Sequence, residues 1–108
     1  MCGIYKITNK LNNKCYIGKS SDINKRWQTH RYEYKGKREY NKLLYAAFRK
    51  YGLENFTFEV LEEFNKDDYE KFANNREQYW IMYYNSYENG YNATLGGDGG
   101  RIENAVKK

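Results

Sequence analysis

The fold is decided by residues 3–18, which read GIYKITNKLNNKCYIG. Residues 3–9 and 14–18 are short segments rich in β-branched and aromatic side chains, a composition typical of strands. The KLNN segment lies between them, and its Asn12 and Asn13 suit a tight turn because asparagine tolerates left-handed backbone. The stretch therefore predicts a β-hairpin.

Outward from the hairpin, polar residues and glycine divide the chain into further elements. Candidate helix N-caps are supplied by Ser20, Ser21 and Asp22, and Gly52 is a candidate helix terminator. The expected elements are a helix over 22–35, a helix over 40–51, a strand over 56–64 and a helix from 67 to about 85. The glycine-rich segment that follows is expected to be a loose tail or linker. We place the folded domain at residues 1–95 and a glycine-rich polar tail at residues 96–108.

Each expected helix carries an apolar stripe at helical spacing. The stripes consist of Ile23, Trp27, His30 and Tyr34; of Leu43, Leu44, Ala47, Phe48 and Tyr51; and of Phe72, Ala73, Trp80, Ile81 and Tyr84. The order strand, strand, helix, helix, strand, helix predicts an α+β domain with a small, largely antiparallel sheet.

Charge is divided unequally along the 108 residues, which carry a net charge of +5. Residues 1–52 hold 13 basic and 3 acidic side chains, whereas residues 53–108 hold 6 and 11, so the halves carry +10 and −5. A cationic face of this kind suits a polyanion such as nucleic acid, because each lysine or arginine displaces a counterion from phosphate. The alternative is a solvated surface without a ligand.

Composition narrows the class of protein further. Hydrophobic residues make up 40% of the chain, enough for one modest core, and 13 tyrosines supply most of the aromatic surface. Two cysteines, Cys2 and Cys15, without a secretory leader pattern favour a cytoplasmic protein with reduced thiols. No apolar run approaches the roughly 20 residues that cross a bilayer, so no membrane insertion is expected.

Three polar side chains fall on faces that should be apolar. Arg26 lies beside the first stripe, one helical turn before His30, which is on it, and Glu77 lies inside the third. Taken alone, Arg26 and His30 are more simply explained as a core histidine with satisfied hydrogen bonds and an arginine that extends to solvent. A buried carboxylate requires a partner, and the adjacent Arg76 points about 100° away around the helix. Glu77 therefore predicts either a basic side chain from elsewhere or a metal ion. Mg²⁺ suits a single carboxylate because it retains waters and takes substrate phosphate as a ligand.

Zinc and a phosphate loop do not fit the sequence. One histidine and two cysteines on neighbouring strands do not supply four ligands at the usual spacing. The GGDGG run follows no strand closely and is not followed by Lys-Ser or Lys-Thr, so we interpret it as flexible chain.

The hairpin and the motifs that follow it resemble the GIY-YIG endonuclease family. Gly3-Ile4-Tyr5 and Tyr16-Ile17-Gly18 match the paired signature. The later motifs appear in family order as Gly18-Lys19, Lys25-Arg26-Trp27 with His30, Asn41 to Leu44 with the KYG ending, Arg76 to Ile81, and Gly90-Tyr91-Asn92. Within the family, these motifs are most similar to those of nuclease domains in phage and group I intron homing endonucleases.

The resemblance implies a three-stranded antiparallel sheet flanked by helices, and DNA hydrolysis with a divalent ion, Mg²⁺ or Mn²⁺, without an organic cofactor. It assigns roles residue by residue, with Tyr5 and Tyr16 as the motif tyrosines, Arg26 as the catalytic arginine, His30 as its helical neighbour, Glu77 as the metal ligand, and Gly18, Lys19 and Asn92 as residues that shape the site or contact substrate. Some homing relatives carry a second histidine between the first two helices, where this chain has Glu39 or Tyr40.

These residues suggest a mechanism for phosphodiester hydrolysis. A tyrosine phenolate, Tyr5 by preference and Tyr16 as the alternative, accepts a proton from water, and Lys19 or Arg26 lowers its pKa. Arg26 clamps phosphate oxygens, and the ion on Glu77 stabilises the 3′ leaving oxygen, which yields 5′-phosphate and 3′-hydroxyl ends. His30 hydrogen-bonds a tyrosine or relays the proton.

Three other functions compete with this hypothesis. The Met-Cys-Gly-Ile start resembles glutamine amidotransferases with a nucleophilic Cys2, although those domains are much longer. A structure-specific DNA repair nuclease of the same family and a non-catalytic DNA-binding module are the others.

Overall fold

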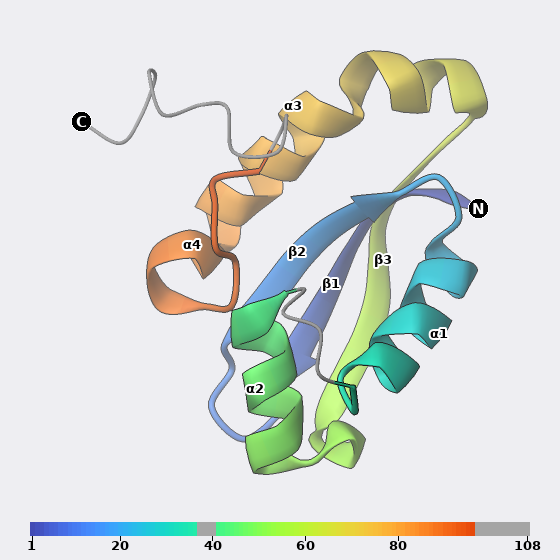
Figure 1. The fold of residues 1–108 in the computed structure, drawn as a ribbon. Coiled ribbons are helices and arrows are strands. Elements are labelled where there is room, and N and C mark those ends of the chain that lie inside the picture. The colour runs from blue at the N-terminus through green and yellow to red at the C-terminus, as the bar shows by residue number, and fades with distance from the viewer. Residues whose placement is uncertain (37–40, 97–108) are drawn as a thin grey trace.

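The computed structural model describes residues 1–36 and 41–96. Its elements, traced in Figure 1, are β1 (Cys2–Asn9), β2 (Cys15–Ser20), α1 (Ile23–Glu33), α2 (Lys42–Tyr51), a 3-10 turn η1 (Leu53–Asn55), β3 (Phe56–Phe64), α3 (Lys66–Tyr84) and α4 (Ser86–Asn89). The predicted order of strands and helices is confirmed, with η1 and α4 added. No helix in these two described segments is long and apolar enough to span a bilayer.

The sheet is antiparallel throughout, with the strand order β2-β1-β3. The predicted hairpin forms β1 and β2, and Asn13 takes the left-handed conformation in its turn at φ 66°. The pairing of β1 with β3 shifts register between Ile4 and Tyr5, and there a Cβ on Gly3 would collide with the Glu62 carbonyl. Because β1 is the central strand, β2 lies at an edge of the sheet.

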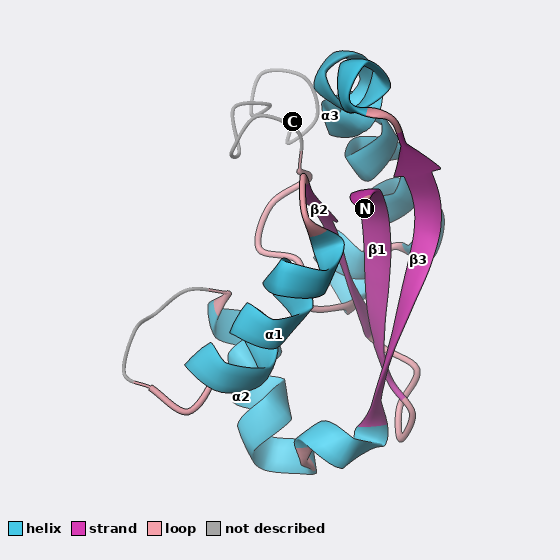
Figure 2. Ribbon diagram, turned by 90° about the vertical axis from the view of Figure 1, so that its right-hand side faces the viewer, coloured by secondary structure: helices cyan, strands magenta, loops and turns pink. Residues whose placement is uncertain are grey.

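Alternation along β1 sends side chains to two cores, one on each face of the sheet. Tyr5 and Ile7 join the core that is built with α1 and α2, which Figure 2 shows together to one side of the strands. Ile4 joins the smaller core that contains Ile81 of α3. The sheet therefore separates α1 and α2 from α3.

The helix boundaries follow the predicted caps. Of the three candidate N-caps of α1, Asp22 is the one used, and its carboxylate accepts a hydrogen bond from the Lys25 amide at 3.2 Å. Gly52 ends α2 at φ 90°. The predicted start of α2 at residue 40 lies outside the described residues. Two stripe assignments are wrong, because Leu43 and Phe72 are 47% and 48% exposed. Each flanks its apolar stripe rather than pointing into it.

Residues 86–96 have a turn-rich composition that predicts no regular element. This part of the chain forms α4 and then packs against β2, where the Tyr91 amide donates to the Cys15 carbonyl at 2.9 Å. Leu95 is buried in the α3-side core. Packing against the open edge of β2 satisfies backbone groups of that strand. A turn-rich composition does not predict such packing. The proposed tail, apart from Gly96, lies outside the described residues.

Candidate active site

A polar cavity of about 490 Å³ opens at the edge of β2. It is lined by Tyr16, Lys19, Ser20, Ser21, Arg26, Asn41, Lys42, Tyr69, Glu77, Asn92, Ala93, Thr94 and Gly96. Five of the eight predicted site residues therefore lie on its wall. The other three are fully or almost fully buried behind it, and they are Tyr5, Gly18 and His30.

The cavity lies at an edge of the sheet, and this explains how side chains from the two faces of the sheet reach it. Tyr16 projects from β2 toward the α1 side, and Arg26 is presented by the second turn of α1. Glu77 comes from the middle of α3, on the other face. Because no further strand extends the sheet beyond β2 in the described segments, the three side chains reach one cavity around this edge.

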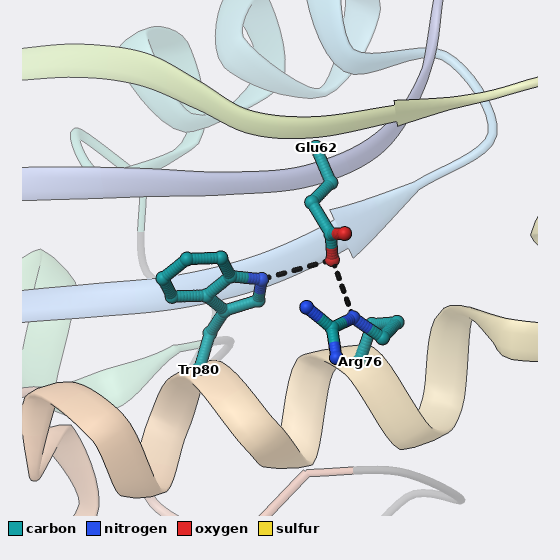
Figure 3. Close-up of polar contacts among 3 residues, drawn as sticks. All are labelled: Glu62, Arg76 and Trp80. Atoms are coloured by element: carbon teal, nitrogen blue, oxygen red, sulfur yellow. Dashed lines mark hydrogen bonds and ion pairs between the residues drawn. The ribbon is translucent and has the colours of Figure 1, made fainter.

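Glu77 is buried, with 9% of its surface exposed, and Arg76 is directed elsewhere as predicted. The Arg76 Nε lies 2.7 Å from Glu62 Oε1, and the Trp80 indole donates to the same oxygen at 2.9 Å (Figure 3). Burial raises the pKa of Glu62, but the hydrogen bonds from Arg76 and Trp80 outweigh it and hold that pKa below its ordinary value. Glu62 thus engages Arg76 on the β3 side of α3.

A hydrogen-bonded trio lies behind the cavity wall. His30 Nε2 is 2.9 Å from the Tyr5 hydroxyl oxygen, and His30 Nδ1 is 2.9 Å from that of Tyr45. Burial, reinforced by nearby Arg26, lowers the pKa of His30 to about 4. The imidazole is therefore neutral at pH 7, and the predicted hydrogen bond from His30 to a tyrosine is confirmed.

The expected activation of a tyrosine by nearby cations is wrong for the free protein. Burial raises the pKa of Tyr5 well above its ordinary value, and burial together with Glu77 raises that of Tyr16. Arg26 lowers both pKa values, but its effect is smaller than that of burial. Desolvation wins because both phenols lie among apolar and aromatic neighbours.

Gly18 has a packing role that was not predicted. A Cβ at this position would lie 2.5 Å from both the Cζ and the hydroxyl oxygen of Tyr5. The Tyr5 ring thus occupies the space above Gly18, with Gly18 and Tyr5 directly paired across β1 and β2. The missing side chain is what lets Tyr5 reach His30.

Asn92 acts on the open edge of β2. Its Oδ1 accepts hydrogen bonds from the Ile17 amide at 2.9 Å and from the Ser86 hydroxyl at 2.6 Å, and its Nδ2 donates to the Ile17 carbonyl at 2.8 Å. One side chain therefore pairs with β2 as a neighbouring strand would. These contacts support a role in shaping the cavity.

Sequence reasoning did not single out Tyr45 or Tyr69, and it named Asn41 and Lys42 only within a family motif, without a role. Asn41 accepts a hydrogen bond from the Tyr16 hydroxyl at 3.1 Å. Tyr45 lies on the buried face of α2, where helical spacing from Phe48 offers a signal. Tyr69 and Glu77 lie two turns apart on α3, a spacing that places both on one face.

Cys2 takes no part in the cavity. Its thiol donates to the Phe64 carbonyl at 3.0 Å, within the pairing of β1 with β3. This location gives the amidotransferase hypothesis no support. Glu39 and Tyr40, the residues at the position of the second histidine of some homing relatives, lie outside the described residues.

Comparison with known proteins places the chain in a family. A family model of the GIY-YIG catalytic domain matches residues 1–92. Two curated proteins of Enterobacteria phage T4 are 41% identical to the chain: intron-associated endonuclease 1, over 87% of this chain and 38% of its own length, and the putative endonuclease segB, over 89% and 39%. The chain thus spans about two fifths of the length of these relatives.

Solved structures show the same fold. The catalytic domain of the homing endonuclease I-TevI superposes with a TM-score of 0.74 at 37% identity, covering 85% of this chain and 97% of that domain. A single-residue variant of that domain superposes with a TM-score of 0.79 at 35% identity, covering 88% and 95%. With its paired strands, its cavity at the edge of β2 and these similarities, the chain belongs to the GIY-YIG family of endonuclease catalytic domains.

Proposed function

We propose that the chain is the catalytic domain of a divalent-metal-dependent DNA endonuclease of the homing type, which hydrolyses phosphodiester bonds. The observation that carries this proposal is the meeting of a phenol, a guanidinium and a carboxylate in one polar cavity, from Tyr16, Arg26 and Glu77. Phosphodiester hydrolysis requires a base for water, charge on the phosphoryl oxygens and help for the leaving oxygen. The cavity offers a residue for each task.

Arg26 and Lys19 are suited to hold the substrate phosphate. Both line the cavity, and the Arg26 side chain is exposed to an incoming ligand. The planar guanidinium of arginine forms two parallel hydrogen bonds with phosphate oxygens, whereas lysine acts as a point charge. Arg26 therefore orients the phosphoryl group, and Lys19 adds to the attraction for the DNA backbone.

As a phenolate, Tyr16 replaces Tyr5 as our favoured proton acceptor, with Arg26 as the cation that favours its ionised form. Tyr5 is fully buried and its hydroxyl is engaged by His30, whereas Tyr16 lines the cavity that contains Arg26 and Glu77. A general base must come within hydrogen-bonding reach of the attacking water, and only the cavity-lining phenol of the two has that access. Tyr5 and His30 then act as its buried support.

The residues of the cavity fit a magnesium or manganese ion. Glu77 presents a buried carboxylate to a polar, open space, and no group of three or more His, Cys, Asp or Glu side chains gathers in the described residues. A single carboxylate suits an ion that keeps several waters and takes its remaining ligands from substrate phosphate. Glu77 would hold the ion, which when bound supplies Lewis-acid stabilisation of charge on the phosphate and the 3′ leaving oxygen.

Nicking of supercoiled plasmid DNA tests the proposal. The full chain is incubated with the plasmid and MgCl₂ or MnCl₂, and the wild type is compared with Tyr16→Phe, Arg26→Ala and Glu77→Ala. We expect each variant to lose at least about 100-fold in rate, because each removes a general base, a phosphate clamp or the metal ligand.

Each matched control makes the same substitution at a position that does not line the cavity. Tyr32→Phe alters a tyrosine that is 74% exposed, Arg31→Ala removes an arginine from the same helix as Arg26, and Glu70→Ala removes an exposed carboxylate two turns before Glu77 on α3. These variants should nick DNA at the wild-type rate. Undiminished nicking by Glu77→Ala would sink the metal-ligand assignment.

The same assay separates the competing functions. Binding of DNA without cleavage under either ion would identify a binding module. Cleavage confined to branched or damaged duplexes, with linear and supercoiled DNA untouched, would identify a structure-specific repair nuclease.

A further inference from the structure

Tyr69 presents a phenol to the cavity from near the start of α3. It lies eight residues before Glu77, so the two side chains leave one face of the helix about 12 Å apart along its axis. Tyr69 therefore serves a different part of the cavity wall from the Glu77 carboxylate.

The Tyr69 hydroxyl is not committed to the protein, unlike the other phenols at or behind the cavity wall. Tyr5 and Tyr45 each share a hydrogen bond with His30, and the Tyr16 hydroxyl also has a protein partner. Among the described residues, none forms a hydrogen bond with the hydroxyl of Tyr69. The side chain is half-buried, so its hydroxyl is available to a ligand that enters the cavity.

This phenol is a hydrogen-bond donor at neutral pH. Burial and the nearby Glu77 raise the pKa of Tyr69 above its ordinary value, and the smaller effect of Arg26 opposes them. An unperturbed tyrosine already keeps its proton at pH 7, so a raised pKa leaves the hydroxyl fully protonated. Tyr69 is thus suited to donate to an anion rather than to accept a proton.

Lys19 reaches the same cavity from the α3 face of the sheet. It pairs directly with Ile4 across β1 and β2, and directly paired residues project to one face. Ile4 belongs to the core that contains Ile81 of α3, so the Lys19 side chain starts on that side too. Arg26, by contrast, comes from α1 on the other face. The α3 side of the cavity therefore holds one ammonium and one uncommitted phenol.

The acidic side chains beside Tyr69 do not oppose an anion in the cavity. Asp67 and Asp68 lie in the first turn of α3, where negative charge stabilises the start of a helix, and Glu70 follows Tyr69. None of the three lines the cavity, whose wall holds Glu77 as its one acidic side chain among the described residues. An anion between Lys19 and Tyr69 therefore meets none of these three carboxylates in the wall.

We propose that Tyr69 and Lys19 form a subsite for a backbone phosphate next to the cleaved bond, while Arg26 holds the phosphate that is cleaved. The Tyr69 hydroxyl donates a hydrogen bond to a non-bridging phosphate oxygen, and the Lys19 ammonium supplies the opposite charge. Two phosphates held at once fix the direction of the strand as well as its position, which orients the cleaved bond in the cavity. The identity of the ligand as DNA rests on the proposed function.

Binding without cleavage tests the subsite. The Kd of the full chain for a short fluorescein-labelled duplex is measured by anisotropy in EDTA. Tyr69→Phe keeps the ring and removes the hydroxyl, so we expect the Kd to rise about tenfold. The slope of log K against log salt concentration should stay the same, because the lost group carries no charge. Tyr83→Phe is the matched control on the same helix, 63% exposed and outside the cavity wall, and it should bind as the wild type does.

A double variant tests whether the two side chains share one phosphate. If they do, Lys19→Ala already releases that phosphate, so the addition of Tyr69→Phe should raise the Kd by no more than about twofold. A full tenfold further rise would place Tyr69 on a different group and overturn the shared subsite. Wild-type affinity in Tyr69→Phe would also overturn it, and a loss seen only in Tyr69→Ala would assign the contact to stacking on a base.

Urea unfolding shows whether the substitution disturbs the fold. Because the Tyr69 hydroxyl has no hydrogen-bond partner among the described residues, the stability of Tyr69→Phe should match that of the wild type. Weaker binding at unchanged stability supports a contact with DNA, whereas equal losses of stability and binding would overturn the proposal.

Cleavage kinetics separate the subsite from the proposed function. In single-turnover reactions with Mg²⁺, Tyr69→Phe should raise the enzyme concentration for half-maximal rate about tenfold, more than it lowers the rate at saturation. A wild type that binds DNA without cleaving it would sink the proposed function and leave the binding result standing. Normal cleavage by the wild type, with equal affinity in Tyr69→Phe, would sink the subsite alone. A wild type that binds no DNA would overturn both.

Discussion

Protonation of His30 is coupled to the stability of the fold. The side chain is fully buried, and its pKa of about 4 lies below the ordinary value of 6.5 that the unfolded chain would show. Below pH 6.5 the unfolded state therefore binds a proton that the native state does not bind. The stability that His30 contributes is complete above pH 6.5 and is lost as the pH falls toward 4.

Denaturant unfolding at two pH values measures this coupling. Between pH 7.5 and pH 5, the free energy of unfolding of the wild type should fall by about 2 kcal/mol more than that of His30→Gln, which lacks the titrating group. Most carboxylates remain ionised at pH 5, so their contribution is small in both proteins. Equal losses in the two proteins, or a His30 pKa near 6.5 by NMR titration, would contradict the buried neutral imidazole.

Single residues also show where sequence reasoning succeeds. Glu77 was singled out because a carboxylate on an apolar helix face needs a partner, whereas Arg26 was assigned its role by the family resemblance, and both line the cavity. Tyr69 gave no such signal, and Asn41 was noted only as part of a family motif. A tyrosine is ordinary on a half-buried helix face. The hydrogen bond of Asn41 with Tyr16 depends on where β2 lies, and no local sequence pattern encodes that position.

At the scale of the elements, the strands and the three long helices were predictable because each carries its own periodicity and caps. The segment after α3 was not. The segment Gly90-Tyr91-Asn92 has the composition of a loop, and it is held in place by hydrogen bonds to β2. A Cβ on Gly90 would lie 2.5 Å from the Cys15 carbonyl oxygen, so this glycine allows close contact with the strand.

Removal of the Asn92 side chain should therefore loosen the edge of β2. In Asn92→Ala the Ile17 amide and carbonyl and the Ser86 hydroxyl lose their partners, which should cost about 2–4 kcal/mol of unfolding free energy. Hydrogen exchange at the Ile17 amide should accelerate with it. Asn89→Ala, at an exposed position of α4, is the control, and it should change neither quantity. Normal protection of Ile17 in Asn92→Ala would refute the pairing of this side chain with β2.

The whole molecule brings the two halves of the charge pattern together. The basic half of the sequence supplies β1, β2, α1 and α2, and with them Arg26, Lys19 and Lys42 in the cavity wall. The acidic half supplies β3, α3 and α4, and contributes Glu77. The cavity lies where these halves meet, and its cationic side chains come from the basic half.

Salt dependence of DNA binding tests this arrangement. If Lys19 contacts a phosphate, Lys19→Ala should reduce the slope of log K against log salt concentration by about 1 and weaken binding to all sequences alike. Lys66→Ala removes an exposed lysine at the start of α3 that is not among the residues lining the cavity, and it should leave the slope unchanged. An unchanged slope in Lys19→Ala would place this lysine outside the DNA interface.

The closure of β2 by one amide side chain has a consequence for using the domain as a transplantable module. An open strand edge is adhesive, because its unpaired backbone groups recruit strands from other chains. A fusion junction placed before residue 92 would separate Asn92 from Ile17 and expose such an edge. A junction beyond Leu95 would keep both the seal and the core contact of Leu95. Grafting of this domain onto a new targeting protein therefore calls for a cut after residue 95.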